Sequence, residues 1–444
     1  MPPREKLPEV DRISHGTPHR LLVLSNGHGE DLIALRVCEA LRRLRPKLPM
    51  AVLPLVGEGG AFAAAPQELD LERLGPCLPL PSGGFSNQSV RGLLQDVAAG
   101  LPRTTWQQLQ VVRRWGAAGQ PILAIGDLLP LAMAWLSGGP YGFIGTPKSD
   151  YTWRSPSPAG WSPSPLADGY HRCKGSEWDP WEWALMAHRH CRLVVVRDAL
   201  TARGLRSHHV RALAPGNPMM DGFEAKELPS SLRHHRRVLL LPGSRLPEAL
   251  GNFKRLLSGL PHPSQCDSLG GVSVLVPISQ GLNRSSEVAA IMAEAHFEPV
   301  PPPLLSEAEG CWSKGSLRVL FGVGRFASWA PWAEVGLATA GTATEQLVGL
   351  GLPALSLPGA GPQFTVGFAR RQSRLLGGAV EPCKTPGRMQ MRLLELLEDA
   401  SARWRLGRKG KQRMGPAGGS EALAHLIVAR LLYDDSAFPA SRAG

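Results

Sequence analysis

Short apolar runs alternate with longer amphipathic segments along most of the chain. The run at 21–26 is followed by an amphipathic segment at 32–44, and further apolar runs follow at 51–56, 121–127 and 141–145. Such alternation is typical of βα units that build a parallel sheet. The pattern therefore predicts an α/β fold with doubly wound parallel sheets.

The alternation breaks once and then restarts, which divides the chain into two halves of similar size. Residues 216–236 mix Gly, Pro, Ser and clustered basic residues without apolar periodicity, as an interdomain linker does. Apolar runs resume at 237–245, 271–279 and 317–323. Because open α/β sheets bind ligands at the carboxyl ends of their strands, we expect two Rossmann-like domains that face one central crevice.

The predicted domain organisation follows from this division. We expect an N-terminal tail (1–19), a first Rossmann-like domain (20–215) with a Pro/Ser/Trp-rich insert (151–183), and a linker (216–236). A second Rossmann-like domain (237–418) follows, and a C-terminal helix (419–444) packs back toward the first domain.

The composition fits folded domains without a membrane span. Of 444 residues, 43% are hydrophobic and 19% charged, close to globular averages. The longest apolar stretch, 122–136, contains Asp127 and Pro130 and is shorter than the roughly 20 residues of a spanning helix. No apolar signal-peptide segment precedes Leu21. Seven scattered cysteines without a C-x-x-C pair indicate a reducing, cytoplasmic compartment.

The charge balance adds a preference for anionic partners. The formal net charge is +12, and 39 of the 49 basic residues are arginine. The planar guanidinium group suits phosphate, although a high arginine content also follows from genomic base composition alone.

A glycine-rich turn follows the first predicted strand. Gly27, His28, Gly29, Glu30 and Asp31 lead directly into a helix. Glycines let a ligand approach the backbone there, and the helix N-terminus offers free N–H groups. The turn lacks the G-x-G-x-x-G pattern of a dinucleotide site. Two interpretations remain: His28 is a functional group at the sheet edge, or the turn is structural and its two acidic residues cap the helix.

Asp127 ends another buried strand and precedes an apolar helix. Its carboxylate either caps that helix or acts as a base at the sheet edge, where poor solvation would raise its basicity. Its predicted position at the same edge as His28 favours catalysis.

In the second half, glycines recur at three predicted strand ends. Gly243, Ser244 and Arg245 follow one strand, and an A-G-T-A-T segment at 340–344 opens a helix after another. A third strand leads into G-A-G-P-Q at 359–363. Exposed N–H groups beside a guanidinium group suit a diphosphate, so we expect one diphosphate-sugar pocket.

No metal site and no cofactor are expected. The sequence has no D-x-D pair, and the histidines and cysteines between 171 and 191 lack zinc-finger spacing. Trp178, Trp181 and Trp183 form a cluster that either packs in the interior or lies at a membrane interface, and packing is favoured.

Several of these segments together resemble a known family. They are LSNGHGEDLIA, AIGDLLPLA, FIGTPKSDYTWR, APGNPMMDG, LLPGSRLPE, AGTATEQLVGLGLPAL and GPQFTVGFARRQ, spread from residue 21 to about 375. Their order and spacing resemble the lipid-A-disaccharide-synthase-related glycosyltransferases, two-domain GT-B enzymes that are similar also to the peptidoglycan GlcNAc transferase.

The resemblance implies a role for each half. The C-terminal half would bind the UDP-sugar donor, and the N-terminal half the acceptor. The implied donor residues are Gly243, Ser244, Arg245, Gly341, Thr342 and Thr344, with Gln363 near the sugar. The family's ribose-binding Glu falls on Gln346, with the acid at Glu345 instead. The implied acceptor-side residues are Asn26, Gly27, Gly29 and Thr146, and either His28 or Asp127 would be the base.

The function implied is an inverting, metal-independent transfer of a hexose or N-acetylhexosamine from a UDP-sugar to a lipid-linked acceptor, by a peripheral protein at the cytosolic membrane face. One alternative is a UDP-sugar 2-epimerase of the same architecture, and another is a non-catalytic relative. A basic nucleic-acid-binding protein would interleave aromatic residues with arginines, whereas here tryptophans gather in the insert, so no nucleic acid partner is expected.

Overall fold

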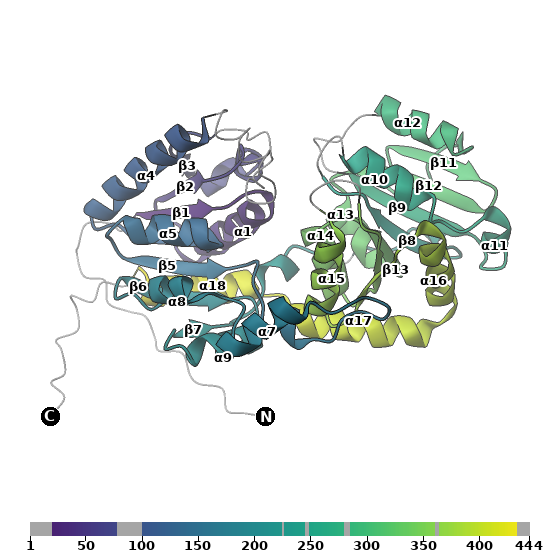
Figure 1. Cartoon of the computed structure of the whole chain (residues 1–444). Coiled ribbons are helices and arrows are strands. Elements are labelled where there is room, and N and C mark those ends of the chain that lie inside the picture. Colours follow the sequence, from purple (N-terminus) through teal and green to yellow (C-terminus); the bar gives the residue numbers. More distant parts are fainter. Residues whose placement is uncertain are drawn as a thin grey trace.

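The computed structural model describes residues 20–77, 100–223, 226–244, 248–278, 285–359 and 364–432, and for His28 and Ser285 it describes the backbone alone. Within these ranges the chain builds two sheets that lie side by side, each flanked by helices (Figure 1). The predicted α/β class with two largely parallel sheets is confirmed.

The first sheet has seven parallel strands in the order β3-β2-β1-β4-β5-β6-β7. They are β1 (Leu21–Ser25), β2 (Met50–Pro54), β3 (Leu71–Arg73), β4 (Ile122–Gly126), β5 (Tyr141–Gly145), β6 (Cys191–Val196) and β7 (Ala212–Leu213).

Helices bury both faces of this sheet. They are α1 (His28–Leu44), α2 (Gly60–Ala63), η1 (Gln67–Leu69), α4 (Leu101–Ala117), α5 (Leu128–Leu136), α6 (Tyr151–Arg154), α7 (Pro165–Lys174), α8 (Pro180–Met186) and α9 (Ala199–Arg206). Leu21 and Val23 of β1 join the core beneath α1, while Leu22 and Leu24 join the core beneath α4 and α5. Because both faces are covered, the strands are continuous apolar runs rather than alternating ones.

The second sheet has eight strands in the order β10-β11-β12-β9-β8-β13-β14-β15. They are β8 (Arg236–Leu241), β9 (Val272–Ile278), β10 (Glu298–Pro299), β11 (Gly310–Lys314), β12 (Leu317–Val323), β13 (Val335–Ala338), β14 (Ala354–Ser356) and β15 (Val380–Pro382). The pairs β10–β11 and β11–β12 are antiparallel, and this edge has no counterpart in the sequence prediction. The remaining pairs are parallel.

Helices also cover the second sheet. They are α10 (Glu248–Leu257), α11 (Pro263–Asp267), α12 (Ser285–Glu294), α13 (Phe326–Trp329), η6 (Ala330–Trp332), α14 (Thr342–Gly349), α15 (Val366–Leu375) and α16 (Pro386–Glu398). Of the helices in the described ranges, none is long and apolar enough to cross a bilayer.

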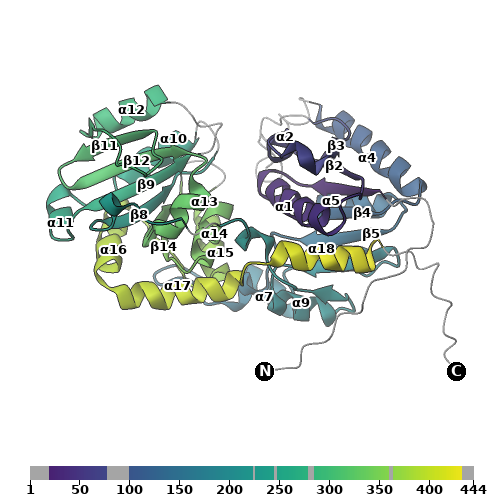
Figure 2. The ribbon, with the colours of Figure 1, turned by 180° about the vertical axis from the view of Figure 1, so that it is seen from behind.

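Two connections join the halves. The predicted linker contains the short helices η3 (Pro218–Met220) and η4 (Ser230–Leu232), and the buried side chains of Met219 and Met220 join a core that extends into both halves. The chain then returns through α17 (Ala400–Met414), packed against α14, and α18 (Gly419–Arg430), packed against α1 of the first half (Figure 2). Asp221 accepts hydrogen bonds from the N–H groups of Gly418 and Ser420, which fixes the start of α18 against the linker.

The packing of α17 on the turn that follows α14 leaves no room for a side chain at Gly407. A Cβ atom there would lie 1.8 Å from the carbonyl oxygen of Gly351. We expect Gly407→Ala to lower the free energy of unfolding by about 1–3 kcal/mol or more, since the helices must separate. Gly251→Ala in α10, where a Cβ atom would have no described neighbour within 4 Å, should instead be neutral or stabilising by up to about 1 kcal/mol. Chemical denaturation of both variants measures the difference, and equal effects would contradict this account of the packing.

Candidate functional site

Three neighbouring strands of the first sheet end at one edge and bring predicted residues together. Asn26 follows β1, Asp127 follows β4 and Thr146 follows β5. Asn26 Nδ2 donates to Asp127 Oδ1 at 2.8 Å, and the Thr146 N–H donates to the Gly126 carbonyl at 3.2 Å. Gly27 has φ of 123°, which a residue with a side chain rarely adopts, so the turn into α1 requires glycine.

Asp127 caps α5. Its Oδ1 accepts a hydrogen bond from the N–H of Leu129 at 3.1 Å in addition to the one from Asn26. The capping interpretation of the sequence is therefore what the geometry shows. A role as a base remains a prediction.

Glu30, in the first turn of α1, lies at the same edge. Its Oε1 accepts a hydrogen bond from Thr146 Oγ1 at 3.2 Å. Burial raises the pKa of Glu30 to about 7; hydrogen bonds from its own backbone and Thr146 oppose the rise, and the nearby Asp127 and Asp31 carboxylates add to it. A carboxyl group that titrates near neutral pH can both accept and release a proton.

Asp31, the next residue, is fully buried and has a structural partner. Ser25 Oγ donates to its Oδ1 at 2.5 Å. Burial raises the pKa of Asp31 to about 6, with the Ser25 hydrogen bond opposing the rise. From the sequence, Glu30 and Asp31 were expected only to cap the helix. The raised pKa of Glu30 was not predicted, because its burial follows from the packing of distant strands. The available signal was its position directly after a glycine turn at a strand end.

Three predicted residues lie partly or wholly outside the described residues. His28 begins α1, but its side chain is not described, and Arg245 and Gln363 fall in the ranges 245–247 and 360–363. Their predicted roles stay predictions.

Side-chain hydrogen bonds hold the main chain at the ends of β8 and β13 in the second half. Gly243, after β8, has φ of 99°, and Thr339, after β13, donates its hydroxyl to the Pro242 carbonyl at 3.0 Å. Gln372 of α15 donates its amide to the carbonyls of Ala340 and Gly341, each at 3.2 Å. The Thr344 hydroxyl also donates to the Ala340 carbonyl, at 2.7 Å. These bonds fix the two carbonyls that precede α14, and the first amides of a helix are the groups that can bind an anion there.

The two edges meet at Gly29 and Thr342. A Cβ atom at Gly29 would lie 2.9 Å from Thr342 Oγ1, so the turn into α1 and the start of α14 touch. Beside this contact, Arg197 forms an ion pair with Glu345 at 2.7 Å and donates to the Thr146 carbonyl at 3.3 Å. The candidate acceptor side and donor side therefore face each other directly.

Two predicted donor residues, Glu345 and Gln346, contact the first half and the linker. Glu345 pairs with Arg197 of the first half, and both side chains are largely buried. Gln346 is buried and donates its amide to the Met219 carbonyl in the linker at 2.8 Å. In this arrangement neither polar group points freely toward a ribose, and their predicted donor contacts stay predictions.

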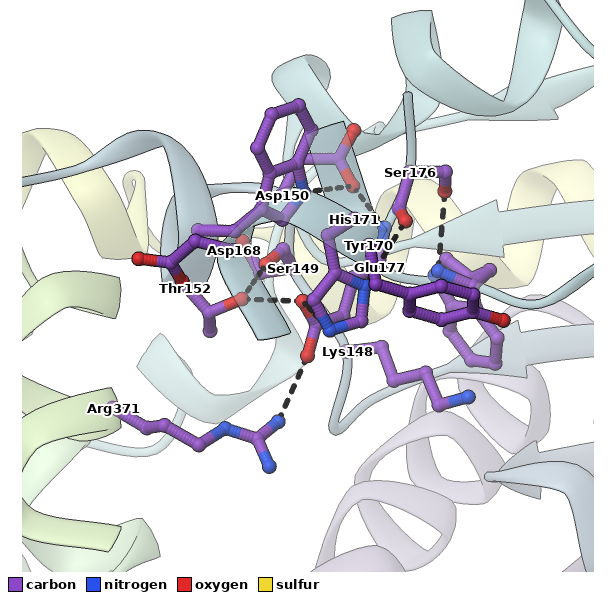
Figure 3. A network of polar contacts seen from close by, with 12 residues as sticks. Lys148, Ser149, Asp150, Thr152, Asp168, Tyr170, His171, Ser176, Glu177 and Arg371 are labelled. Carbon is purple, nitrogen blue, oxygen red and sulfur yellow. Dashed lines mark hydrogen bonds and ion pairs between the residues drawn. The ribbon is translucent and has the colours of Figure 1, made fainter. Parts of the chain in front are cut away.

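The 151–183 insert is held by a network of buried carboxylates. Glu177 accepts a hydrogen bond from Thr152 Oγ1 at 2.7 Å, and its N–H donates to Asp150 Oδ1 at 2.7 Å. Burial raises the pKa of Asp150 to about 6. Figure 3 shows Glu177 between Thr152 and Arg371, whose Nη2 lies 2.9 Å from Glu177 Oε1.

Arg371 comes from α15, so the insert contacts the second half. Arg374 of the same helix is buried, and it donates to the Asp168 carboxylate at 2.8 and 3.0 Å. It also donates to the carbonyls of Trp153 and Ser155 at 2.7 and 2.8 Å. The insert is thus a structural bridge between the halves, which its composition did not indicate.

The tryptophans of the insert mostly pack, as expected. Trp178 is fully buried, and Trp183 stacks on His208 with ring centroids 3.6 Å apart, whereas Trp181 is 56% exposed. Within the described residues, no group of three or more His, Cys, Asp or Glu side chains could hold a metal ion.

No protein-family model matches this sequence, and no curated protein does. Solved structures, in contrast, are similar over nearly the whole chain. S. aureus MnaA in a co-structure with UDP has a TM-score of 0.56 at 11% identity, covering 93% of this chain and 96% of that one. A UDP-GlcNAc 2-epimerase from Neisseria meningitidis bound to UDP-GlcNAc has a TM-score of 0.53 at 13% identity, covering 93% and 100%.

A glycosyltransferase also belongs to this set. The glycotransferase of kitacinnamycin has a TM-score of 0.51 at 16% identity, covering 94% of this chain and 100% of that one. At such identities the similarity shows the fold alone. The chain therefore has the two-domain GT-B architecture that its sequence predicted, while the resemblance to lipid A disaccharide synthase stays a hypothesis.

Proposed function

We propose that this chain is a UDP-sugar-dependent glycosyltransferase that transfers a hexose or N-acetylhexosamine to a lipid-linked acceptor, with inversion and without a metal ion. The observation that carries the proposal is the contact between Gly29 and Thr342. It sets the candidate acceptor edge of one sheet against the candidate donor edge of the other, as a transfer between two substrates requires.

The donor would be held by the start of α14. The amides of a helix N-terminus and the helix dipole favour a diphosphate, and Gly341, which precedes α14, has no side chain to block its approach. Of the residues that the structure describes, only Phe368 would lie within 4 Å of a Cβ atom at Gly341, at 3.7 Å. Gly243 and Ser244 would border the same position from β8, with the uridine nearby.

The acceptor would be held by the first half, where α5 offers an apolar surface. Leu128 and Leu129, directly after Asp127, are each 37% exposed, as is Leu136 near the other end of α5, beside Trp135 at 40%. An exposed apolar path that begins at a site edge suits a substrate with a hydrocarbon chain.

The neighbouring helices extend this surface, which supports peripheral binding to the cytosolic face of a membrane. Trp106 of α4 and Trp181 of α8 are each 56% exposed, and both helices pack against α5. Arg113 and Arg114 of α4 are also exposed. Tryptophan beside arginine is favoured at the interface of an anionic bilayer.

The donor proposal predicts that UDP binds the protein and raises its melting temperature. Gly341→Asp should weaken UDP binding about tenfold or more, because its carboxylate would lie where the diphosphate binds, while capping preserves the helix. Gly341→Asn has the same shape without the charge and should bind UDP more tightly than the Asp variant. Thermal shift over a UDP concentration series measures both affinities. No shift for the wild type with any nucleoside diphosphate would contradict the proposal.

A second candidate function is 2-epimerisation of a UDP-sugar. It is favoured by the similarity to the solved 2-epimerases, whose architecture spans nearly the whole chain. An epimerase acts on the donor alone, so incubation with UDP-GlcNAc in D₂O separates the two candidates. We expect the wild type to leave C2 of the sugar unlabelled and unchanged by NMR, and to release UDP when a lipid extract is added. Deuterium at C2 without any lipid would assign the chain to the epimerases.

The acceptor proposal predicts binding to anionic vesicles through α4 and α5. The double variant Trp106→Ala/Trp135→Ala should bind vesicles that contain phosphatidylglycerol about tenfold more weakly than the wild type, because two large apolar side chains are lost. Trp404→Ala is the matched control, since Trp404 of α17 is 63% exposed beside Arg405 and Arg408. Vesicle co-sedimentation measures both. If Trp404→Ala alone loses vesicle binding, the membrane-binding surface lies on α17 instead. No vesicle binding by the wild type would contradict membrane association.

A further inference from the structure

Three carboxylates gather at the edge of the first sheet, and the fold uses two of them. Asp127 Oδ1 accepts from Asn26 and from the N–H of Leu129, which orients β1 and starts α5. Asp31 accepts from Ser25 inside the core. Glu30 accepts a single side-chain hydrogen bond, from Thr146, and among the described residues no basic side chain forms an ion pair with it.

Glu30 also lies where the halves of the molecule meet. It follows Gly29, the residue that touches Thr342 at the start of α14. The side chain crosses toward β4 and β5, since a Cβ atom at Gly126 would lie 3.5 Å from Glu30 Cγ. A reacting group between the two edges would therefore be adjacent to Glu30.

We propose that Glu30 is the proton acceptor for the acceptor hydroxyl, an inference that rests on the proposed transferase function. The hydroxyl oxygen forms its new bond to the anomeric carbon of the sugar while the bond from that carbon to the β-phosphate oxygen of UDP breaks. UDP leaves with the electron pair of that bond. The hydroxyl proton passes to the Glu30 carboxylate, which later releases it to solvent.

The surroundings of Glu30 suit this task. Asp127 faces it from the start of α5 and Asp31 from the same helix, and both like charges favour the protonated form after transfer. Thr146 is a positioning residue, because its hydroxyl fixes one oxygen of the carboxylate. Arg197, which follows β6, pairs with Glu345 and donates to the Thr146 carbonyl. Among the described residues Asn26 Oδ1 has no hydrogen-bond partner, so it offers an acceptor for a second substrate hydroxyl.

The first test needs no substrate. A carboxyl group whose pKa is raised on folding contributes stability below its unfolded pKa of about 4.5, and that contribution is lost as the pH rises through its folded pKa of about 7. Glu30→Gln does not titrate at this position. The melting temperature of the variant minus that of the wild type should therefore increase by about 2 °C when the pH is raised from 5 to 8. A difference that does not change with pH would show that Glu30 does not hold a proton near neutrality and would overturn the inference.

The second test measures turnover as UDP release, with water or a lipid extract as acceptor. Glu30→Gln should lower the rate about 100-fold or more and abolish the rising limb of the pH–rate profile. Glu30→Asp should be faster than Glu30→Gln and should show the rising limb again, with its midpoint at a different pH. Asp127→Asn should lower the rate because it weakens the N-terminal cap of α5, and its pH–rate profile should keep the rising limb. A limb that persists in Glu30→Gln and disappears in Asp127→Asn would assign the base to Asp127.

The UDP thermal shift separates this inference from the proposed function. Glu30 lies on the acceptor side, so Glu30→Gln should bind UDP with an affinity within about twofold of that of the wild type. Absence of a UDP shift in the wild type would count against the transferase function. A normal shift combined with normal turnover in Glu30→Gln would overturn the role of Glu30 alone.

Discussion

The buried guanidinium of Arg374 fixes the position of one half of the molecule relative to the other. It reaches from α15 into the first half and donates to the Asp168 carboxylate and to two main-chain carbonyls. A buried charge is tolerated only when it is paired and its donors are satisfied, so the insert must keep this conformation. Two residues earlier in the same helix, Gln372 holds the carbonyls that precede α14. One helix therefore binds the first half and also fixes the start of α14, the candidate phosphate site.

The acidic side chains at the first sheet edge differ in environment rather than in chemistry. Asp127 accepts hydrogen bonds from the Asn26 side-chain amide and from the N–H of Leu129 at the start of α5. Asp31 lies in the core with one hydroxyl, and Glu30 lies at the boundary between the halves. Groups of the same type that differ in solvation can take different protonation states at one pH, which is the usual basis for a division between structural and proton-transferring roles.

The sequence predicted the parts of the fold that repeat locally. The apolar runs located nearly all parallel strands because strands covered on both faces are continuous apolar segments, and glycine turns located the strand ends. The antiparallel pair β10–β11 was missed, because β10 is only two residues long and has no pattern of its own. The contacts of Glu345 and Gln346 were missed for a different reason. Their partners, Arg197 and the Met219 carbonyl, are more than 120 residues away in sequence, and no local pattern encodes such pairs.

Contacts between distant segments also change the meaning of the basic composition. The charge of +12 suggested an attraction to anionic surfaces, yet many of the arginines bind protein carbonyls and carboxylates. Arg42 donates to four main-chain carbonyls, and Arg36 donates to two in the linker. A lysine could not replace them, since its single ammonium group lacks the planar fork that reaches several acceptors at once. At these two positions arginine rather than lysine has a structural reason, and exposed arginines remain on helices such as α4 and α17.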